Sequence, residues 1–181
     1  MKLDFTIREK GIFRFLIVMF VANFLWKLSI QGDEFHKEVL LFGLWDIQAF
    51  FRPAILSTAK LASMLLNLFG VDCVLGESGR IYFLNHYAIE VVWGCTAIKQ
   101  SFIFVCIMLF AYGRFTPKVL YNLICLILIF FINVFRIAIV GGISQAYPEL
   151  FSLLHGVLFK YLFYFILFLL WLYWNERIEK C

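Results

Sequence analysis

Three side chains that can carry out acyl transfer lie at three separate points of the chain: Cys95, Arg136 and His155. Cys95 stands within residues 92–100, where a polar, strand-like stretch gives way to a long apolar run. A thiolate attacks a carbonyl carbon, a histidine supplies and withdraws protons, and an arginine stabilises the oxyanion or orients the substrate. The set predicts a cysteine nucleophile with two partners, provided that the fold brings them together.

The composition is that of an integral membrane protein. Hydrophobic residues make up 64% of the chain and charged residues 15%, which is too apolar for a soluble domain to cover with a polar surface. We therefore expect an all-α polytopic membrane protein that forms a single domain over residues 1–181. The net charge of +4 comes from short basic clusters beside the apolar runs. Such clusters report orientation in the membrane, so no nucleic-acid partner is expected.

Four apolar runs are candidates for membrane spans, each of which needs about 20 residues. The runs are residues 11–30, 97–112, 119–141 and 157–174. Basic residues precede the first run, follow the last, and form a short loop between the second and third. The positive-inside rule then places both termini in the cytoplasm. The long first run is expected to be a span rather than a cleaved signal peptide.

Residues 31–94 must then begin and end outside the membrane. Residues 38–51 and 54–69 are apolar but short, and Pro53 is expected to break any continuous helix between them. They fit an in-and-out hairpin, which gives six spans in all, or two amphipathic helices on the outer surface, which gives four. Both arrangements stay open, with a slight preference for the surface.

The pattern changes to short β-type segments from Gly70 onward. Residues 71–75, 80–83 and 87–91 are separated by turns that carry glycine, asparagine and histidine. Strands cannot face lipid with unpaired edges. The pattern therefore predicts a small extracytoplasmic β-ribbon that leads to Cys95.

The expected orientation brings the three reactive side chains to one depth. Cys95 precedes the second apolar run and His155 opens the last, while Arg136 lies about 25 Å beyond Val119 at about 1.5 Å per residue. Taken singly, each has an ordinary explanation: an inert thiol, a snorkelling arginine and an interfacial histidine. Their shared depth instead favours a catalytic three-helix region over residues 95–181.

Three further residues are candidates for supporting roles. Lys99 lies one helical turn beyond Cys95, where its charge would favour the thiolate or simply snorkel. Asn133 lies one turn before Arg136 and would orient it or bond a neighbouring helix. Glu90 would pair with Arg136 or Lys99, or remain a solvated strand carboxylate.

The cysteines contain no CxxC pair, which argues against a dithiol redox enzyme and a zinc site. We expect no metal and no cofactor. Cys73 would be able to form a disulfide in an oxidising exterior, but pairing with Cys95 would inactivate the nucleophile. His36 and His86 lie in outer loops and are not expected to take part.

At these residues the chain resembles a short member of the exosortase/archaeosortase family of membrane cysteine transpeptidases. Residues 95–99 (CTAIK) look like the family's Cys-Ser-Gly-Ile/Leu-Arg motif, and residues 133–137 (NVFRI) look like its Asn-x-x-Arg block. His155, at the start of the last apolar helix, looks like its histidine block. Order and spacing agree over roughly residues 65–165, where Ile89-Glu90-Val91 also matches.

The resemblance implies that Cys95 is the nucleophile, with Arg136 and His155 as its partners. The implied protein is a thiol protease or transpeptidase of a bacterial or archaeal cytoplasmic (inner) membrane, with its site on the extracytoplasmic face. Its substrates would be secreted proteins whose C-terminal sorting signal has a short motif, a membrane helix and a basic tail. The acyl-enzyme would be resolved by an acceptor nucleophile at the outer face, such as a lipid or a glycan.

The chain departs from the family pattern at two places. Thr96-Ala97 stands where the family has Ser-Gly, and Gly156 where an acidic residue often follows the histidine. Two other function classes stay open. One is a non-catalytic membrane scaffold or assembly factor, in which Arg136 and His155 are interfacial anchors. The other is a transport component, although polar residues should then recur at mid-depth.

Overall fold

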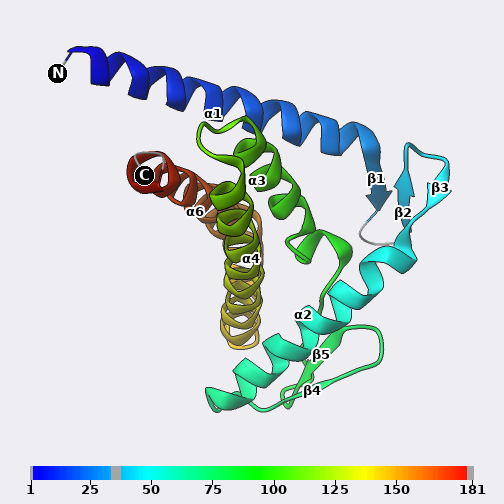
Figure 1. Ribbon diagram of the computed structural model, residues 1–181. Helices are drawn as coiled ribbons and strands as arrows, with labels where there is room; N and C mark the ends of the chain where they lie inside the picture. Colours follow the sequence, from blue (N-terminus) through cyan, green and yellow to red (C-terminus); the bar gives the residue numbers. More distant parts are fainter. Residues whose placement is uncertain (1, 34–37, 179–181) are drawn as a thin grey trace.

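A computed structural model describes residues 2–33 and 38–178 of the chain (Figure 1). It consists of long helices and two small antiparallel sheets. The helices are α1 (Lys2–Ser29), α2 (Gln48–Leu68), α3 (Ile98–Phe110), α4 (Phe115–Ser144), α5 (Phe151–Leu153) and α6 (Phe159–Tyr173). The predicted polytopic helical membrane fold is confirmed.

Within the described residues, four helical segments are long and apolar enough to cross a membrane. They are Gly11–Ser29, Gln48–Leu68, Phe115–Ser144 and Pro148–Glu176. Three of them match predicted spans. The fourth predicted span, residues 97–112, forms only the 13-residue helix α3, which is about 20 Å long. Helix α2, which the pattern divided into shorter pieces, has the required length instead.

The predicted helix break at Pro53 is wrong. Helix α2 runs without interruption from Gln48 to Leu68 and contains Pro53 in its second turn. The missing N–H and the crowding of the Ala49 carbonyl therefore affect only its N-terminal end. Beyond that point α2 packs against α4 and β4 along a buried face rich in small residues. This packing outweighs the local cost of the proline.

Residues 30–33 and 38–46 contain a sheet that the sequence pattern did not predict. Its strands are β1 (Ile30–Asp33), β2 (Glu38–Leu41) and β3 (Trp45–Asp46), paired antiparallel in that order. The expected helix over residues 38–51 is therefore wrong. Phe42 and Gly43 have φ values of 52° and 69°, and two such residues reverse the chain between β2 and β3. Gly43 between two apolar runs was the available signal.

The predicted β-ribbon is present as a second sheet. Its strands are β4 (Cys73–Leu75), β5 (Arg80–Phe83) and β6 (Ala88–Glu90), again antiparallel in chain order. Gly79, in the turn between β4 and β5, has a φ of 83°, and an added Cβ would lie 2.8 Å from Ile55 of α2. Glycine thus allows both the turn and the close approach of the sheet to α2. The side of the membrane on which the sheet lies stays a prediction.

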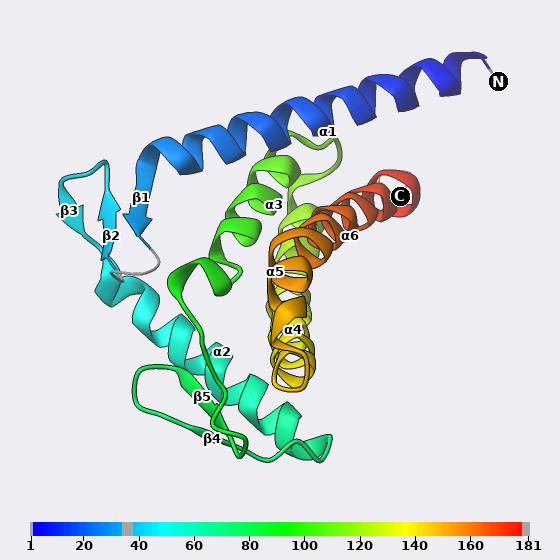
Figure 2. The same ribbon diagram turned by 180° about the vertical axis from the view of Figure 1, so that it is seen from behind.

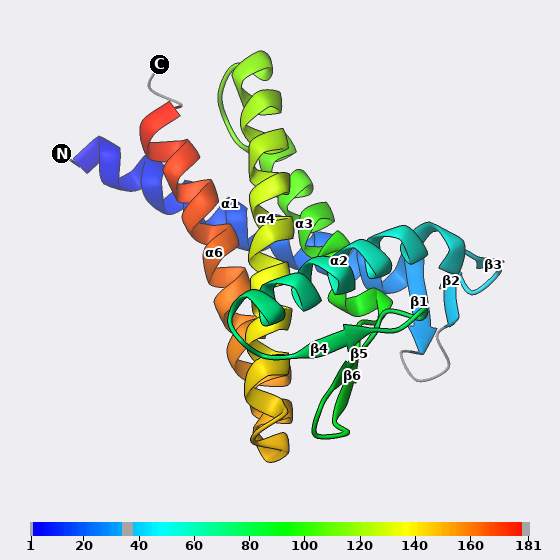
Figure 3. The ribbon, with the colours of Figure 1, turned by 90° about the horizontal axis from the view of Figure 1, so that it is seen from below.

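The helices cross rather than form a parallel bundle. Helices α4 and α6 run alongside one another, and α2 runs across α4 (Figure 3). Helix α1 contacts α3 at the opposite side of the molecule from α2 (Figure 2). The two larger hydrophobic clusters meet at the start of α3: Cys95 belongs to the cluster with α2 and the second sheet, and Ala97 to the cluster with α1, α4 and α6. A third, smaller cluster consists of Trp26, Val39 and Phe51.

Candidate active site

Cys95 lies in a 3₁₀ turn, Trp93–Cys95, directly before α3. The Thr96 hydroxyl donates to the Trp93 carbonyl over 2.7 Å. Ala97 then adopts a left-handed conformation with φ 60°, and α3 begins at Ile98. The thiol therefore stands at the N-terminal end of a helix, whose partial positive charge favours an anion such as a thiolate.

The backbone conformation of Ala97 shows what one departure from the family motif costs. The left-handed conformation costs a non-glycine residue about 1–2 kcal/mol, whereas glycine adopts it readily. The position thus has the backbone for which the motif's glycine is suited, and the chain holds an alanine there at a cost. Thr96 retains the hydroxyl that the motif's serine would supply.

Asn133 fixes the Cys95 turn to α4. Its Nδ2 donates to the Cys95 carbonyl oxygen over 2.6 Å, and its side chain is fully buried. Of the two expected roles, the structure shows the bond to a neighbouring segment. Because Arg136 follows one turn later, the same face of α4 holds the backbone of Cys95 and carries the arginine.

Arg136 and His155 are in contact. Arg136 Nη2 lies 3.4 Å from His155 Nδ1, and the imidazole stacks on the Phe151 ring with a centroid distance of 5.3 Å. A guanidinium can only donate, so in a hydrogen bond between these two atoms Nδ1 accepts and the ring proton is on Nε2. His155 lies in a π-helical stretch, Leu154–Leu158, a distortion that is common at functional sites.

A small central cavity joins the three predicted residues. It has a volume of about 30 Å³, roughly enough for one water molecule. Its lining includes Cys95, Arg136, His155, Glu90 and Phe151. Residues that come from three separate parts of the sequence therefore line one small volume.

Two of the supporting residues have surroundings that the sequence did not predict. Lys99 does not share a continuous helix with Cys95, because the left-handed Ala97 interrupts the backbone between them. Glu90 forms a salt bridge with Arg80 at 2.7 Å, a partner that the sequence reasoning missed. Opposite charges at the paired ends of two predicted strands were the available signal.

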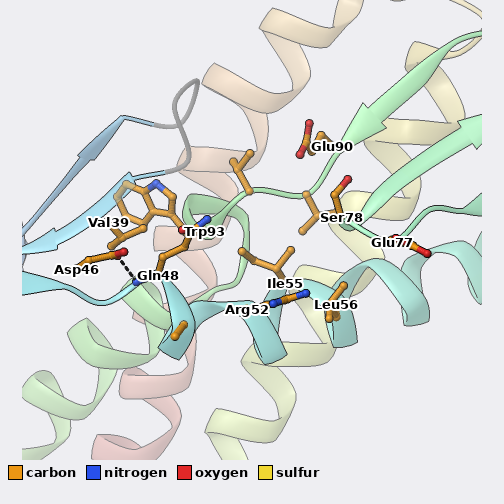
Figure 4. A pocket seen from close by; sticks show the side chains of 13 residues that line it. Val39, Asp46, Gln48, Arg52, Ile55, Leu56, Glu77, Ser78, Glu90 and Trp93 are labelled. Carbon is orange, nitrogen blue, oxygen red and sulfur yellow. Dashed lines mark hydrogen bonds between the residues drawn. The ribbon is translucent and has the colours of Figure 1, made fainter.

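Two larger cavities flank the central cavity. The first, which we call the mixed groove, has a volume of about 390 Å³ and lies between α2, the two sheets and Trp93. Figure 4 shows Asp46 and Gln48 at one end and Glu77 and Ser78 at the other. The groove shares Glu90 with the central cavity.

The second, which we call the basic cavity, has a volume of about 380 Å³. It shares Arg136 and His155 with the central cavity and Trp93 with the mixed groove. Lys99 lines this cavity. The central cavity, which Cys95 lines, therefore shares lining residues with a groove of mixed charge and with a basic cavity.

The remaining candidates lie elsewhere. His36 falls outside the described residues. His86 is exposed at the turn between β5 and β6, with a φ of 65°. Cys73 and Cys95 are both present as thiols rather than as a disulfide. Within the described part of the chain, no group of three or more His, Cys, Asp or Glu residues is arranged to hold a metal ion.

Comparison with known proteins gives one match. The model of the transmembrane exosortase family (Exosortase_EpsH) matches residues 35–173, which is most of the chain and includes all six candidate site residues. This match confirms the resemblance read from the motifs. No curated protein and no solved structure matches the chain.

Proposed function

Because the chain belongs to the transmembrane exosortase family, we propose that it is a membrane-embedded cysteine transpeptidase or protease. It cleaves the C-terminal sorting signals of secreted proteins at the extracytoplasmic face, through an acyl-enzyme on Cys95. The observation that carries the proposal is the central cavity, which Cys95, Arg136 and His155 line together.

The first half-reaction begins from the observed contact between Arg136 and His155. When a substrate enters, the guanidinium moves from Nδ1 to the oxygen of the scissile carbonyl, and Nδ1 takes the Cys95 proton. The thiolate then forms a C–S bond with the carbonyl carbon. Arg136 and the partial positive charge at the N-terminal end of α3 stabilise the oxyanion. Collapse breaks the C–N bond, and His155 returns its proton to the leaving amine.

The second half-reaction releases the acyl group. A hydroxyl or amine of the acceptor attacks the thioester and gives its proton to His155. The new C–O or C–N bond forms as the C–S bond breaks, and the thiolate is regenerated and reprotonated. Water in place of the acceptor makes the same protein a protease.

The mixed groove is the proposed site for the short recognition motif. Arg52, Asp46 and Glu77 offer charges of both signs, and Ile55 offers an apolar wall. A pocket of this volume suits several residues of an extended peptide. Glu90 borders both the groove and the central cavity, so a motif bound there lies directly beside the proposed nucleophile.

Detection of the acyl-enzyme tests the proposal. The purified protein is mixed with a peptide that carries a sorting signal and is analysed by intact mass spectrometry. We expect an added mass equal to the N-terminal fragment, released by hydroxylamine as thioesters are. Arg136→Ala should slow its formation by about 100-fold, as loss of an oxyanion donor does. Lys60→Ala, an exposed change on α2, is the control. An adduct that still forms in Cys95→Ala would refute the proposal.

A further inference from the structure

The basic cavity gathers cations from four different helices. Its charged lining residues are Lys27 of α1, Lys99 of α3, Arg136 of α4 and Lys160 of α6. No carboxylate is among the described residues that line it. The mixed groove, with nearly the same volume, is lined by Asp46, Glu77 and Glu90 as well as by Arg52. Charge, and not size, distinguishes the two cavities.

The lysines are close enough to influence one another. The charges of Lys27 and Lys160 both act on Lys99, which is itself half-buried. Like charges around one partly enclosed volume repel each other more strongly than in bulk water, because the effective dielectric constant is lower. An anion inside the cavity would turn this repulsion into attraction.

The neutral side chain of Trp93 joins the cationic lining. The Trp93 indole Nε1 is buried and has no hydrogen-bond partner among the described residues. Trp93 also lines the basic cavity. A buried N–H without a partner costs free energy, and an anionic oxygen would satisfy it.

We propose that the basic cavity binds the phosphate group of the acceptor that resolves the acyl-enzyme. A phosphate offers several strong acceptor oxygens to lysines and an arginine. The volume of about 380 Å³ also leaves room for a small group attached to the phosphate. The inference rests on the proposed function, because Arg136 and His155 line this cavity and the central cavity alike.

The shared residues explain how a bound phosphate would serve the second half-reaction. The phosphate occupies the lysine side of the cavity, and the acceptor's hydroxyl or amine extends toward His155. His155 takes its proton as the bond to the acyl carbon forms and the C–S bond breaks. The lysines are positioning residues in this step, whereas His155 handles the proton.

A binding experiment tests the site without any turnover. Cys95→Ala protein in phosphate-free detergent is titrated with glycerol 3-phosphate, followed by ³¹P NMR, and with phosphatidylglycerol, followed by native mass spectrometry. We expect at least one of the two probes to bind. Binding of glycerol 3-phosphate alone indicates a soluble acceptor, and binding of phosphatidylglycerol indicates a lipid headgroup. Adding Lys27→Gln and Lys160→Gln should weaken binding by at least about tenfold, since charge-assisted hydrogen bonds are lost. Lys27→Arg with Lys160→Arg should restore it, and Lys60→Gln is the matched control.

Two outcomes overturn the proposal: neither probe binds, or the Lys27→Gln, Lys160→Gln protein binds as tightly as its parent. A second readout uses the active protein. The ratio of transferred to hydrolysed product should fall about tenfold in the same double variant, and an unchanged ratio contradicts the proposed role. If no acyl-enzyme forms in any variant, the proposed function fails. The binding result then stands by itself as evidence for or against the phosphate site.

Discussion

Two buried cysteines share one hydrophobic core and differ in what surrounds their sulfur atoms. Cys73 is 9% exposed and Cys95 is 7% exposed, and both belong to the cluster formed by α2, α4 and the second sheet. Each is also held by an asparagine on a helix: Asn67 of α2 bonds the Cys73 backbone twice, and Asn133 of α4 bonds that of Cys95.

The difference lies in the charges that each thiol meets. The Cys73 thiol donates to the Ser63 carbonyl over 3.6 Å, and burial, together with the Asp72 carboxylate, raises the pKa of the Cys73 thiol. Cys95 instead stands at the start of α3, in a cavity lined also by Arg136 and His155. Burial is nearly equal at the two thiols, so burial is not expected to decide which of them reacts. The charge of the neighbouring groups separates the two.

The largest contrast is expected in processing of a co-expressed protein with a C-terminal sorting signal. Cys95→Ala should abolish processing, a loss of at least about 1000-fold, because the nucleophile is removed. Cys73→Ala removes a buried sulfur of the same core and should leave processing within about threefold per folded molecule. Pulse-labelling and gel electrophoresis measure both. Equal losses would mean that the two cysteines are both only structural.

Alkylation gives the next largest contrast. Because the pKa of Cys73 is raised, its thiolate fraction is below that of an ordinary cysteine near pH 7 and grows only as the pH rises. Iodoacetamide should therefore label Cys95 at least about tenfold faster than Cys73 at about pH 7, with the gap narrowing toward about pH 10. Peptide mass spectrometry follows each site. Faster labelling of Cys73 than of Cys95 near neutral pH would contradict the expected difference in reactivity.

Replacing each of the two asparagines should affect stability in both cases but activity in only one. Asn67→Ala removes two partly buried hydrogen bonds and Asn133→Ala removes a buried one, and each should lower the free energy of unfolding by about 1–3 kcal/mol. Only Asn133→Ala is expected to slow the reaction, by about tenfold per folded molecule, because the Cys95 turn loses its tie to α4. Turnover normalised to folded protein distinguishes the two effects. An equal loss of activity in Asn67→Ala would show that α2 also positions the site.

The smallest effect is expected at Ala97. Replacing it with glycine relieves a left-handed alanine with φ 60° but removes a buried methyl, so we expect a net gain in stability of at most about 1 kcal/mol. Ala111→Gly, at an extended residue with φ −70°, is the control and should be destabilising by about 0.5 kcal/mol. Thermal unfolding in detergent compares them. A destabilised Ala97→Gly protein would show that the methyl matters more than the backbone.

The second sheet and the meeting of Cys95, Arg136 and His155 were predictable for local reasons. Alternating residues and a glycine turn predict β4 and β5, and the charge asymmetry of the loops predicts that three helix ends lie at one face. Nothing local predicts that α2 continues through Pro53, because its packing against α4 decides that. The partner of Glu90 likewise depends on the strand register, which pairs it with Arg80.

The short length of α3 constrains the spacing between the substrate's recognition motif and its membrane helix. A bilayer's hydrocarbon layer is about 30 Å thick, and 13 residues of helix rise about 20 Å. If the Arg114 loop marks the cytoplasmic boundary and α3 stands along the membrane normal, the start of α3, just after Cys95, lies about 10 Å beneath the outer one. The scissile bond would then have to enter the membrane to about that depth. The substrate's own helix must therefore begin a fixed number of residues after its recognition motif. Lengthening or shortening the spacer between the recognition motif and the substrate's helix would shift the cleavage position by a corresponding number of residues.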